Sequence, residues 1–118
     1  MGLNRGEIWT VAGGGDATGK PRPVMVLQSD RFDGNDSITV CPLTSDLTDL
    51  GYMRVFVEPS VLNGLRLRSA IMVDKVTTVW RRRTGMKLGE LSPVELADVD
   101  RAVMTFLGLA KRQAEPRS

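Results

Sequence analysis

The chain has 118 residues, a net charge of +2, 42% apolar and 25% charged residues, and this composition is typical of one globular domain. It contains no histidine, which excludes imidazole chemistry, and one cysteine, Cys41, which excludes an internal disulfide and a cysteine cage for zinc. No apolar stretch approaches the roughly 18 residues that cross a bilayer, and no secretory signal is seen at the start. We therefore expect a cytoplasmic protein without a membrane span, in which Cys41 fills part of the core.

Positive charge is concentrated in the second half of the chain. Residues 1–60 carry five Lys and Arg against eight Asp and Glu, whereas residues 61–118 carry eleven against six. Part of this excess is the run 81–83, which consists of arginines. The asymmetry favours a polyanionic partner such as nucleic acid, but solvated charges at strand ends would give the same pattern.

Alternating and apolar segments predict a series of short strands. The first covers 7–11, and the glycine-rich stretch after it lacks the Gly-Lys-Ser/Thr order of a phosphate-binding loop, so we interpret it as a plain connection. The second strand, 23–28, is almost continuously apolar and is expected to be buried on both faces. Further strands are predicted at 37–43, 52–58, 69–79 and 85–91.

A helix near the end of the chain has the clearest local signal. Ser92, Pro93 and Glu95 form a capping box with proline at the first helical position. Behind it, apolar residues recur at helical spacing: Leu96, Val99, Val103, Phe106 and Leu107. We predict a helix over 93–110 that packs on the sheet, and then a polar tail, 111–118. Strands followed by one helix indicate an α+β fold, with a strongly bent antiparallel sheet or small barrel over 5–91 in a single domain, 1–118.

Two polar residues stand at the ends of predicted strands. Arg22 precedes the strand 23–28, and Thr44 follows the strand 37–43. If these strands are neighbours, a guanidinium and a hydroxyl converge at one edge of the sheet. Taken singly, each is an ordinary surface or strand residue, so only their joint position singles them out.

Five segments, taken in order, resemble the MazF/PemK family of toxin endoribonucleases. They are 5–9 (Arg-Gly-Glu-Ile-Trp), 22–30, 40–45, 68–74 and 89–93, the last leading into 99–102. The likeness runs from about residue 5 to residue 109, nearly the whole chain. It implies an SH3-like barrel with a C-terminal helix that forms a homodimer. It also implies cleavage of single-stranded RNA without a metal or other cofactor, and inhibition by a cognate antitoxin.

The resemblance also assigns candidate site residues. It gives catalysis to Arg22 and Thr44, and it places Ser69, Asp74 and Lys75 along the groove that binds RNA. The chain departs from the family pattern in three places, and the resemblance implies that these changes alter the preferred RNA sequence or weaken the activity. The loop after the first strand offers only Asp16 where many members have Glu or Gln, Lys75 and Thr77 replace a frequent Gln and Arg, and Met72 stands where some members have Arg.

Further residues are candidates for contacts with RNA. Arg68 is one, and Arg68 or Lys75 would also pair with Asp74 if that carboxylate is buried. Tyr52, which follows a loop, is a candidate platform on which an unstacked base lies. We expect Trp9 and Trp80 in the core or in a dimer contact, and 81–83 at a solvated edge that attracts RNA without reading bases.

The chemistry of RNA agrees with an arginine and a threonine as the catalytic pair. RNA carries its own nucleophile, the 2′-hydroxyl, so an enzyme need only align it and stabilise charge on the phosphate. Arg22 can bind two phosphate oxygens and stays ionised, and Thr44 can hold a phosphate oxygen or the 2′-oxygen. The expected products are a 2′,3′-cyclic phosphate and a 5′-hydroxyl. Arginine is a poor base, with a reference pKa above about 12, so Asp74 or a water held by Thr44 are alternative bases.

Two other functions remain as alternatives. A non-catalytic toxin of the same fold that binds DNA gyrase requires an exposed apolar end of the C-terminal helix, and the polar stretch 110–115 argues against it. A non-enzymatic RNA-binding barrel would keep its effect on growth after Arg22→Ala. In either case an antitoxin could still bind, and we expect its segment to be acidic and to lie across the basic groove over Arg22 and Thr44.

Overall fold

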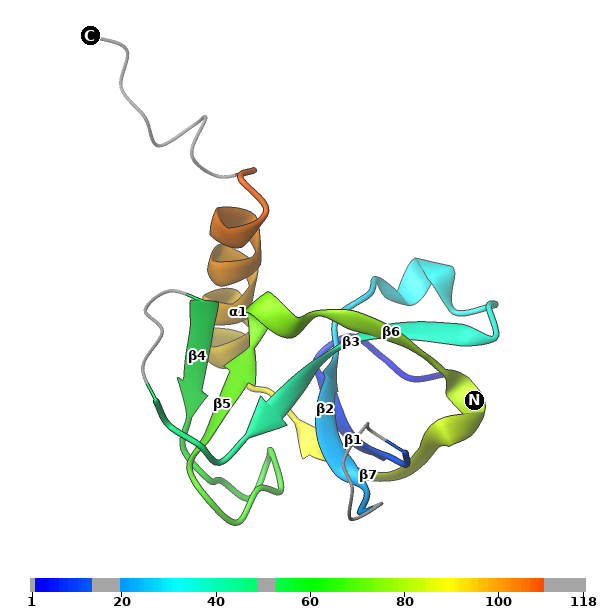
Figure 1. The fold of residues 1–118 in the computed structure, drawn as a ribbon, viewed down its shortest axis with the longest axis horizontal. Coiled ribbons are helices and arrows are strands. Elements are labelled where there is room, and N and C mark those ends of the chain that lie inside the picture. Colours follow the sequence, from blue (N-terminus) through cyan, green and yellow to red (C-terminus); the bar gives the residue numbers. More distant parts are fainter. Residues whose placement is uncertain (1, 14–19, 49–52, 110–118) are drawn as a thin grey trace, which may run out of the picture.

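The computed structural model describes residues 2–13, 20–48 and 53–109, which form seven strands and one α-helix (Figure 1). The strands are β1 (Glu7–Val11), β2 (Arg22–Val26), β3 (Ser37–Thr44), β4 (Arg54–Val57), β5 (Ser69–Met72), β6 (Thr77–Trp80) and β7 (Thr84–Glu90). Three 3-10 turns, η1 (Asp30–Phe32), η3 (Val73–Lys75) and η4 (Arg81–Arg83), and the helix α1 (Pro93–Phe106) complete the described elements. The predicted α+β class is confirmed, and each predicted strand corresponds to at least one observed strand.

The sheet is antiparallel and strongly bent, and its strands follow the order β4-β5-β3-β2-β1-β7. The long strand β3 pairs along one edge with two different strands: its start, Ser37–Val40, pairs with β6, and its end, Leu43 and Thr44, pairs with β5. This confirms the predicted strongly bent antiparallel sheet, and the described strands do not close it into a complete barrel. The chain passes from β6 to β7 through η4, and β7 pairs with β1 in the described part of the chain.

The segment 69–79, predicted as one strand, is divided in two by η3. Val73 at the start of η3 is only 1% exposed, so the turn is held in the core at this point. The break lets β5 and β6 follow different parts of β3, which the bend of the sheet requires.

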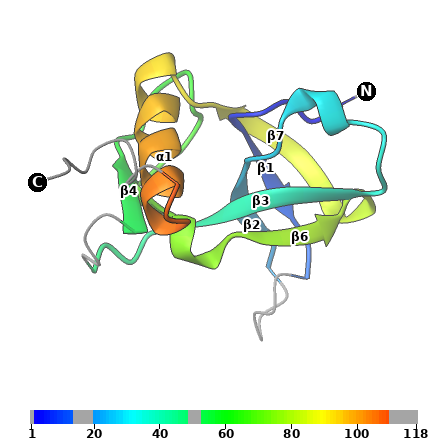
Figure 2. The same cartoon turned by 90° about the horizontal axis from the view of Figure 1, so that it is seen from above.

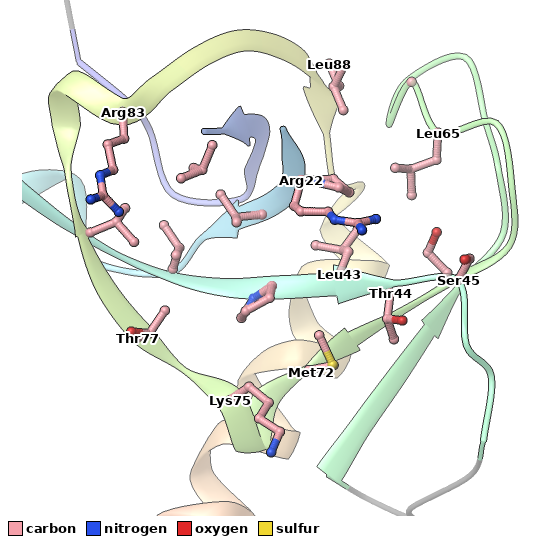
Figure 3. A pocket seen from close by; sticks show the side chains of 18 of the residues that line it. Arg22, Leu43, Thr44, Ser45, Leu65, Met72, Lys75, Thr77, Arg83 and Leu88 are labelled. Carbon is pink, nitrogen blue, oxygen red and sulfur yellow. The ribbon is translucent and has the colours of Figure 1, made fainter. Parts of the chain in front are cut away.

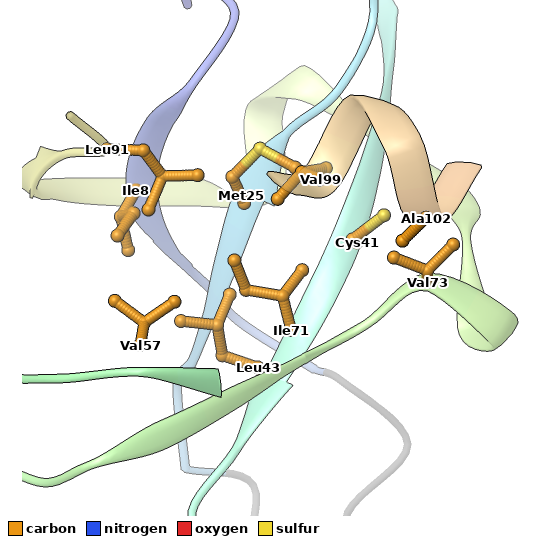
Figure 4. Close-up of a cluster of buried hydrophobic side chains, with 10 residues drawn as sticks. All are labelled: Ile8, Met25, Cys41, Leu43, Val57, Ile71, Val73, Leu91, Val99 and Ala102. Atoms are coloured by element: carbon orange, nitrogen blue, oxygen red, sulfur yellow. The ribbon is translucent and has the colours of Figure 1, made fainter. Parts of the chain in front are cut away.

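The core has two parts, one on each face of the sheet. The larger part lies between the sheet and α1, and it contains Ile8, Met25, Cys41, Leu43, Val57, Ile71, Val73, Leu91, Val99 and Ala102 (Figure 4). The smaller part contains Leu3, Val11, Val24, Val26, Ile38 and Val40. In β2, Met25 joins the larger part whereas Val24 and Val26 join the smaller, so burial on both faces is confirmed. Cys41 is fully buried as expected, and burial raises the pKa of its thiol to about 12.

The helix α1 begins as predicted and ends earlier. The Ser92 hydroxyl accepts a hydrogen bond from the Glu95 amide at 3.1 Å, and the Glu95 carboxylate accepts one from the Ser92 amide at 2.9 Å, which completes the capping box. The helix ends at Phe106, and Gly108 follows with a positive φ of 77°. Phe106 and Leu107, expected on the buried stripe, are 37% and 56% exposed, because they lie beyond the sheet.

Within the described residues, α1 packs against one face of the sheet only. Figures 1 and 2 show α1 beside β4 and away from η4, the corner between β6 and β7. None of the helices in the described ranges is long and apolar enough to cross a membrane. The predicted polar tail lies outside the described residues.

Candidate active site

Antiparallel pairing of β2 with β3 brings Arg22 and Thr44 to one edge of the sheet. Val24 lies opposite Pro42, and Met25 lies opposite Cys41. Continuing this register by two residues from Val24 sets Arg22 opposite Thr44. Residues two apart in a strand point to the same face, so both side chains belong to the face that carries Val24, opposite α1.

Both side chains line one large cavity on this face, with a volume of about 1060 Å³. Figure 3 shows Arg22 and Thr44 near one end of the cavity and Arg83 at the other. The floor is formed by residues of β2 and β3, one wall by the loop 64–67, and the opposite wall by Lys75 and β6.

The lining of the cavity is positively charged. Four cationic side chains contribute to it, and no aspartate or glutamate does among the described residues; the cations are Arg22, Arg66, Lys75 and Arg83. Such a surface attracts polyanions, and the attraction is strongest at low ionic strength.

The hydroxyl of Thr44 is oriented by a backbone amide two residues further along the chain. Its Oγ1 accepts a hydrogen bond from the amide of Asp46 at 3.1 Å. A hydroxyl has one proton and two acceptor positions, so this bond leaves the proton available for a ligand. Accepting a bond also polarises the hydroxyl as a donor. Thr44 is thus arranged to donate to an anionic oxygen in the cavity.

The wall formed by the loop 64–67 is fixed by a buried asparagine and a glycine. The Asn63 side chain, 0% exposed, accepts bonds from the amides of Ser60 and Leu65, both at 3.0 Å. Gly64 has a φ of +70°, and a Cβ there would lie 1.9 Å from the carbonyl oxygen of Leu88 in β7. Only glycine therefore lets the loop approach β7 this closely. The sequence marks these two residues as a turn, but their burial depends on the fold.

The structure brings some of the predicted RNA-binding residues to the cavity and not others. Ser69 and Lys75 line it, and the Ser69 hydroxyl donates to the carbonyl of Leu67 at 3.0 Å. Arg68 does not line it, because its guanidinium pairs with Glu58 at 2.7 Å and stacks over the ring of Phe56. Tyr52 lies outside the described residues.

Asp74 is also absent from the lining, and its partner differs from the prediction. Its carboxylate pairs with Arg54, with Nε to Oδ1 at 2.9 Å and Nη2 to Oδ2 at 3.4 Å. Arg68 and Lys75, the expected partners, make no such bond within the described part of the chain. Arg54 lies on β4, which pairs with β5, and this neighbourhood cannot be read from the sequence.

Two cationic residues of the cavity were not identified from the sequence. Arg66 reaches it through the turn at Gly64, and Arg83 reaches it from η4. The arginine run was expected at a solvated edge, but only part of it is solvated. The side chain of Arg81 is 18% exposed and pairs with Asp33 at 3.1 Å, whereas Arg82 is exposed and stacks over Trp80. Trp80 itself is 49% exposed and not part of the core.

No group of three or more cysteine, aspartate or glutamate side chains that could hold a metal ion is found in the ranges 2–13, 20–48 and 53–109.

Comparison with known proteins identifies the family. The family described as "PemK-like, MazF-like toxin of type II toxin-antitoxin system" matches residues 4–107. A probable endoribonuclease MazF from Mycolicibacterium smegmatis is 44% identical over 108 residues, which cover 92% of this chain and 99% of the relative.

Solved structures agree at the level of the fold. A mycobacterial endoribonuclease in complex with its cognate antitoxin has a TM-score of 0.75 at 21% identity, covering 91% of this chain and 96% of that one. A MazE-MazF structure from Deinococcus radiodurans has a TM-score of 0.74 at 24% identity, covering 93% and 99%. The match over residues 4–107 and the 44% identical relative together show that the chain belongs to the PemK-like, MazF-like family of toxins from type II toxin-antitoxin systems.

Proposed function

We propose that this chain is the toxin of a toxin–antitoxin pair and that it cleaves single-stranded RNA in the cavity that contains Arg22 and Thr44. One observation carries the proposal: an arginine and a threonine from adjacent strands line a cavity with four cations and no carboxylate among its described lining residues. The relative from M. smegmatis aligns with this chain over 99% of its own length, and its name gives the same activity class, an endoribonuclease.

The substrate 2′-hydroxyl is the nucleophile in the proposed reaction. Its oxygen attacks the adjacent phosphorus, the bond from phosphorus to the 5′-oxygen breaks, and the products are a 2′,3′-cyclic phosphate and a 5′-hydroxyl. The 2′-hydroxyl gives up one proton and the leaving 5′-oxygen gains one. Arg22 stabilises the charge on the phosphate oxygens through its planar fork, and Thr44 donates one hydrogen bond to the same phosphate. These steps need no metal ion or other cofactor.

The other cations hold the RNA on both sides of the cleaved bond. Lys75, Arg66 and Arg83 contact flanking phosphates, and the Ser69 hydroxyl supports the loop wall beside them. Such contacts do not depend on the bases, so the preferred RNA sequence is set by other groups at the cavity.

An antitoxin would compete for the same surface. The cationic lining predicts an acidic segment that covers Arg22 and Thr44 and excludes RNA. We further propose that the protein acts in the cytoplasm, where messenger RNA is available, and that it forms a homodimer, which light scattering of the purified chain tests.

Mapping of RNA ends tests the proposed reaction. Purified protein is incubated with a pool of transcripts in excess chelator, and new 5′-hydroxyl ends are sequenced. We expect cleavage at a short common sequence, loss of cleavage in Arg22→Ala, and normal cleavage in Arg101→Ala on the exposed side of α1. Intact RNA, or cleavage only after metal is added, would refute the proposal.

One observation favours the alternative of a gyrase-binding toxin. Phe106, Leu107 and Leu109, at and just beyond the end of α1, are exposed by 37%, 56% and 57%. A supercoiling assay with purified DNA gyrase separates the two functions. Inhibition of gyrase together with intact RNA would favour the alternative, whereas RNA cleavage without inhibition would favour the nuclease.

A further inference from the structure

Asp74, an acidic residue next to the cavity in sequence, pairs with an arginine on strand β4. Asp74 is the central residue of η3, between the buried Val73 and the cavity-lining Lys75. Arg54, twenty residues earlier, forms two hydrogen bonds with its carboxylate. The two side chains are only 10% and 13% exposed, so water weakens this pair less than it would a surface pair.

Arg54 is also close to the segment that carries Thr44. Hydrogen bonds from Thr48 hold the pKa of Asp46 below its ordinary value, and the positive charge of Arg54 adds to this effect. The amide of Asp46 is the group that orients the Thr44 hydroxyl. Arg54 therefore pairs with Asp74 and adds a weaker electrostatic attraction on Asp46, and each of these acidic residues adjoins a residue of the cavity.

The availability of Lys75 for a phosphate depends on this arrangement. Lys75 is exposed, and no ion pair involves it in the described part of the chain. Its sequence neighbour Asp74 is the carboxylate that could neutralise it, and Arg54 holds that carboxylate elsewhere. Without Arg54, Asp74 would face either Lys75 or the RNA, and both outcomes weaken the attraction for phosphate.

We infer that Arg54 is a positioning residue of the RNA site, which holds the Asp74 carboxylate out of the cavity and so leaves the Lys75 ammonium available to phosphate. This inference rests on the proposed function. In this inference Asp74 is a negative charge that Arg54 keeps away from the RNA. It is then neither the general base nor a contact to RNA. Arg54 acts on binding of RNA, and the chemical step at Arg22 and Thr44 is unaffected.

The test measures RNA affinity in single and double variants. The probe is a fluorescent single-stranded oligonucleotide that contains a mapped cleavage site with a 2′-deoxy nucleotide at the scissile position, and anisotropy gives Kd. We expect Arg54→Met to weaken binding about tenfold, the effect of one lost charge-assisted contact. We expect Asp74→Asn alone to bind this probe like the wild type and to cleave the corresponding all-RNA oligonucleotide like the wild type. The double variant R54M/D74N should recover the wild-type Kd, because no free carboxylate remains.

The Tm of each variant is measured in parallel, because in a merely structural pair the Kd would follow the Tm, whereas this inference expects Kd to recover in R54M/D74N whatever its Tm. An equal loss in R54M and R54M/D74N, an unchanged Kd in folded R54M, or loss of cleavage in D74N would each overturn it. If R54M does not fold by circular dichroism, Arg54→Gln replaces it in both variants. Because Gln keeps one donor for Asp74, the expected loss is then smaller than tenfold and should again be recovered in R54Q/D74N, and an unchanged Kd in R54Q would overturn the inference.

The matched control is Arg5→Met, which breaks the ion pair between Arg5 and Asp100 on α1, remote from the cavity. It should lower Tm and leave Kd unchanged. If the wild-type protein cleaves no RNA, the proposed function fails; if it cleaves RNA and R54M binds normally, only this inference fails.

Discussion

Replacing Thr44 by valine removes one hydroxyl from the cavity and keeps the shape of the side chain. The hydroxyl accepts one hydrogen bond in the free protein, from the amide of Asp46 at 3.1 Å. Asp46 is exposed, so water can satisfy this amide in the variant, and the fold should lose little stability. Any large loss of activity then reports on the substrate.

The size of the effect follows from the role given to the hydroxyl. A hydrogen bond to a charged group contributes about 1.5–3 kcal/mol. At 1.36 kcal/mol for each factor of ten, kcat/KM should fall about 10- to 150-fold. Thr44→Ser keeps the hydroxyl and should retain most of the activity.

The assay is single-turnover cleavage of a fluorogenic RNA that carries the mapped site, with Tm measured in parallel. Thr105→Val is the matched control, since Thr105 lies on the exposed side of α1 and donates to the carbonyl of Arg101. Wild-type activity in Thr44→Val, with an intact fold, would refute the assigned role.

Three further changes test the site and the fold. Arg22→Ala should lower kcat about 10²–10³-fold and reduce the salt slope of RNA binding by about 0.7, the value for one phosphate contact on a single strand; an unchanged slope would contradict the contact. Met25→Ala, at a fully buried position between the sheet and α1, should lower the free energy of unfolding by about 2–5 kcal/mol in urea titrations, and a cost below that range would mean a loosely packed core. Burial raises the pKa of Glu7, but hydrogen bonds from Trp9 and Asn4 and the charge of Lys87 outweigh it and hold the pKa below 4.5. A lowered pKa gives stability that is present above pH 4.5 and is lost as pH falls through the folded pKa, so the wild type should lose stability in acid and Glu7→Gln should lose less. Equal acid sensitivity of the two proteins would contradict this.

Local signals were sufficient for most of the secondary structure. The capping box at Ser92 and Glu95 predicts the start of α1, and the alternation in 7–11 predicts β1 at its observed bounds. The break in 69–79 was missed because both halves are apolar and β-branched. The charged pair Asp74 and Lys75 in its middle was the one available signal.

The candidate site was predictable only where two strands are adjacent in sequence. Arg22 and Thr44 flank the connection between β2 and β3, so antiparallel pairing brings them together. Arg66 and Arg83 reach the cavity through the turn at Gly64 and through η4, and the Arg54 partner of Asp74 depends on the register of β4 with β5. These long-range positions carry no sequence signal.

Removal of one oxygen atom from the substrate tests the central claim most directly. Two oligonucleotides with the mapped cleavage site are compared in excess chelator, one all-RNA and one with a single 2′-deoxy nucleotide on the 5′ side of the scissile phosphate, and the products are identified by mass spectrometry. We predict a 2′,3′-cyclic phosphate and a 5′-hydroxyl from the first and no cleavage of the second. Cleavage of the deoxy-substituted strand at the same bond would contradict the proposed reaction.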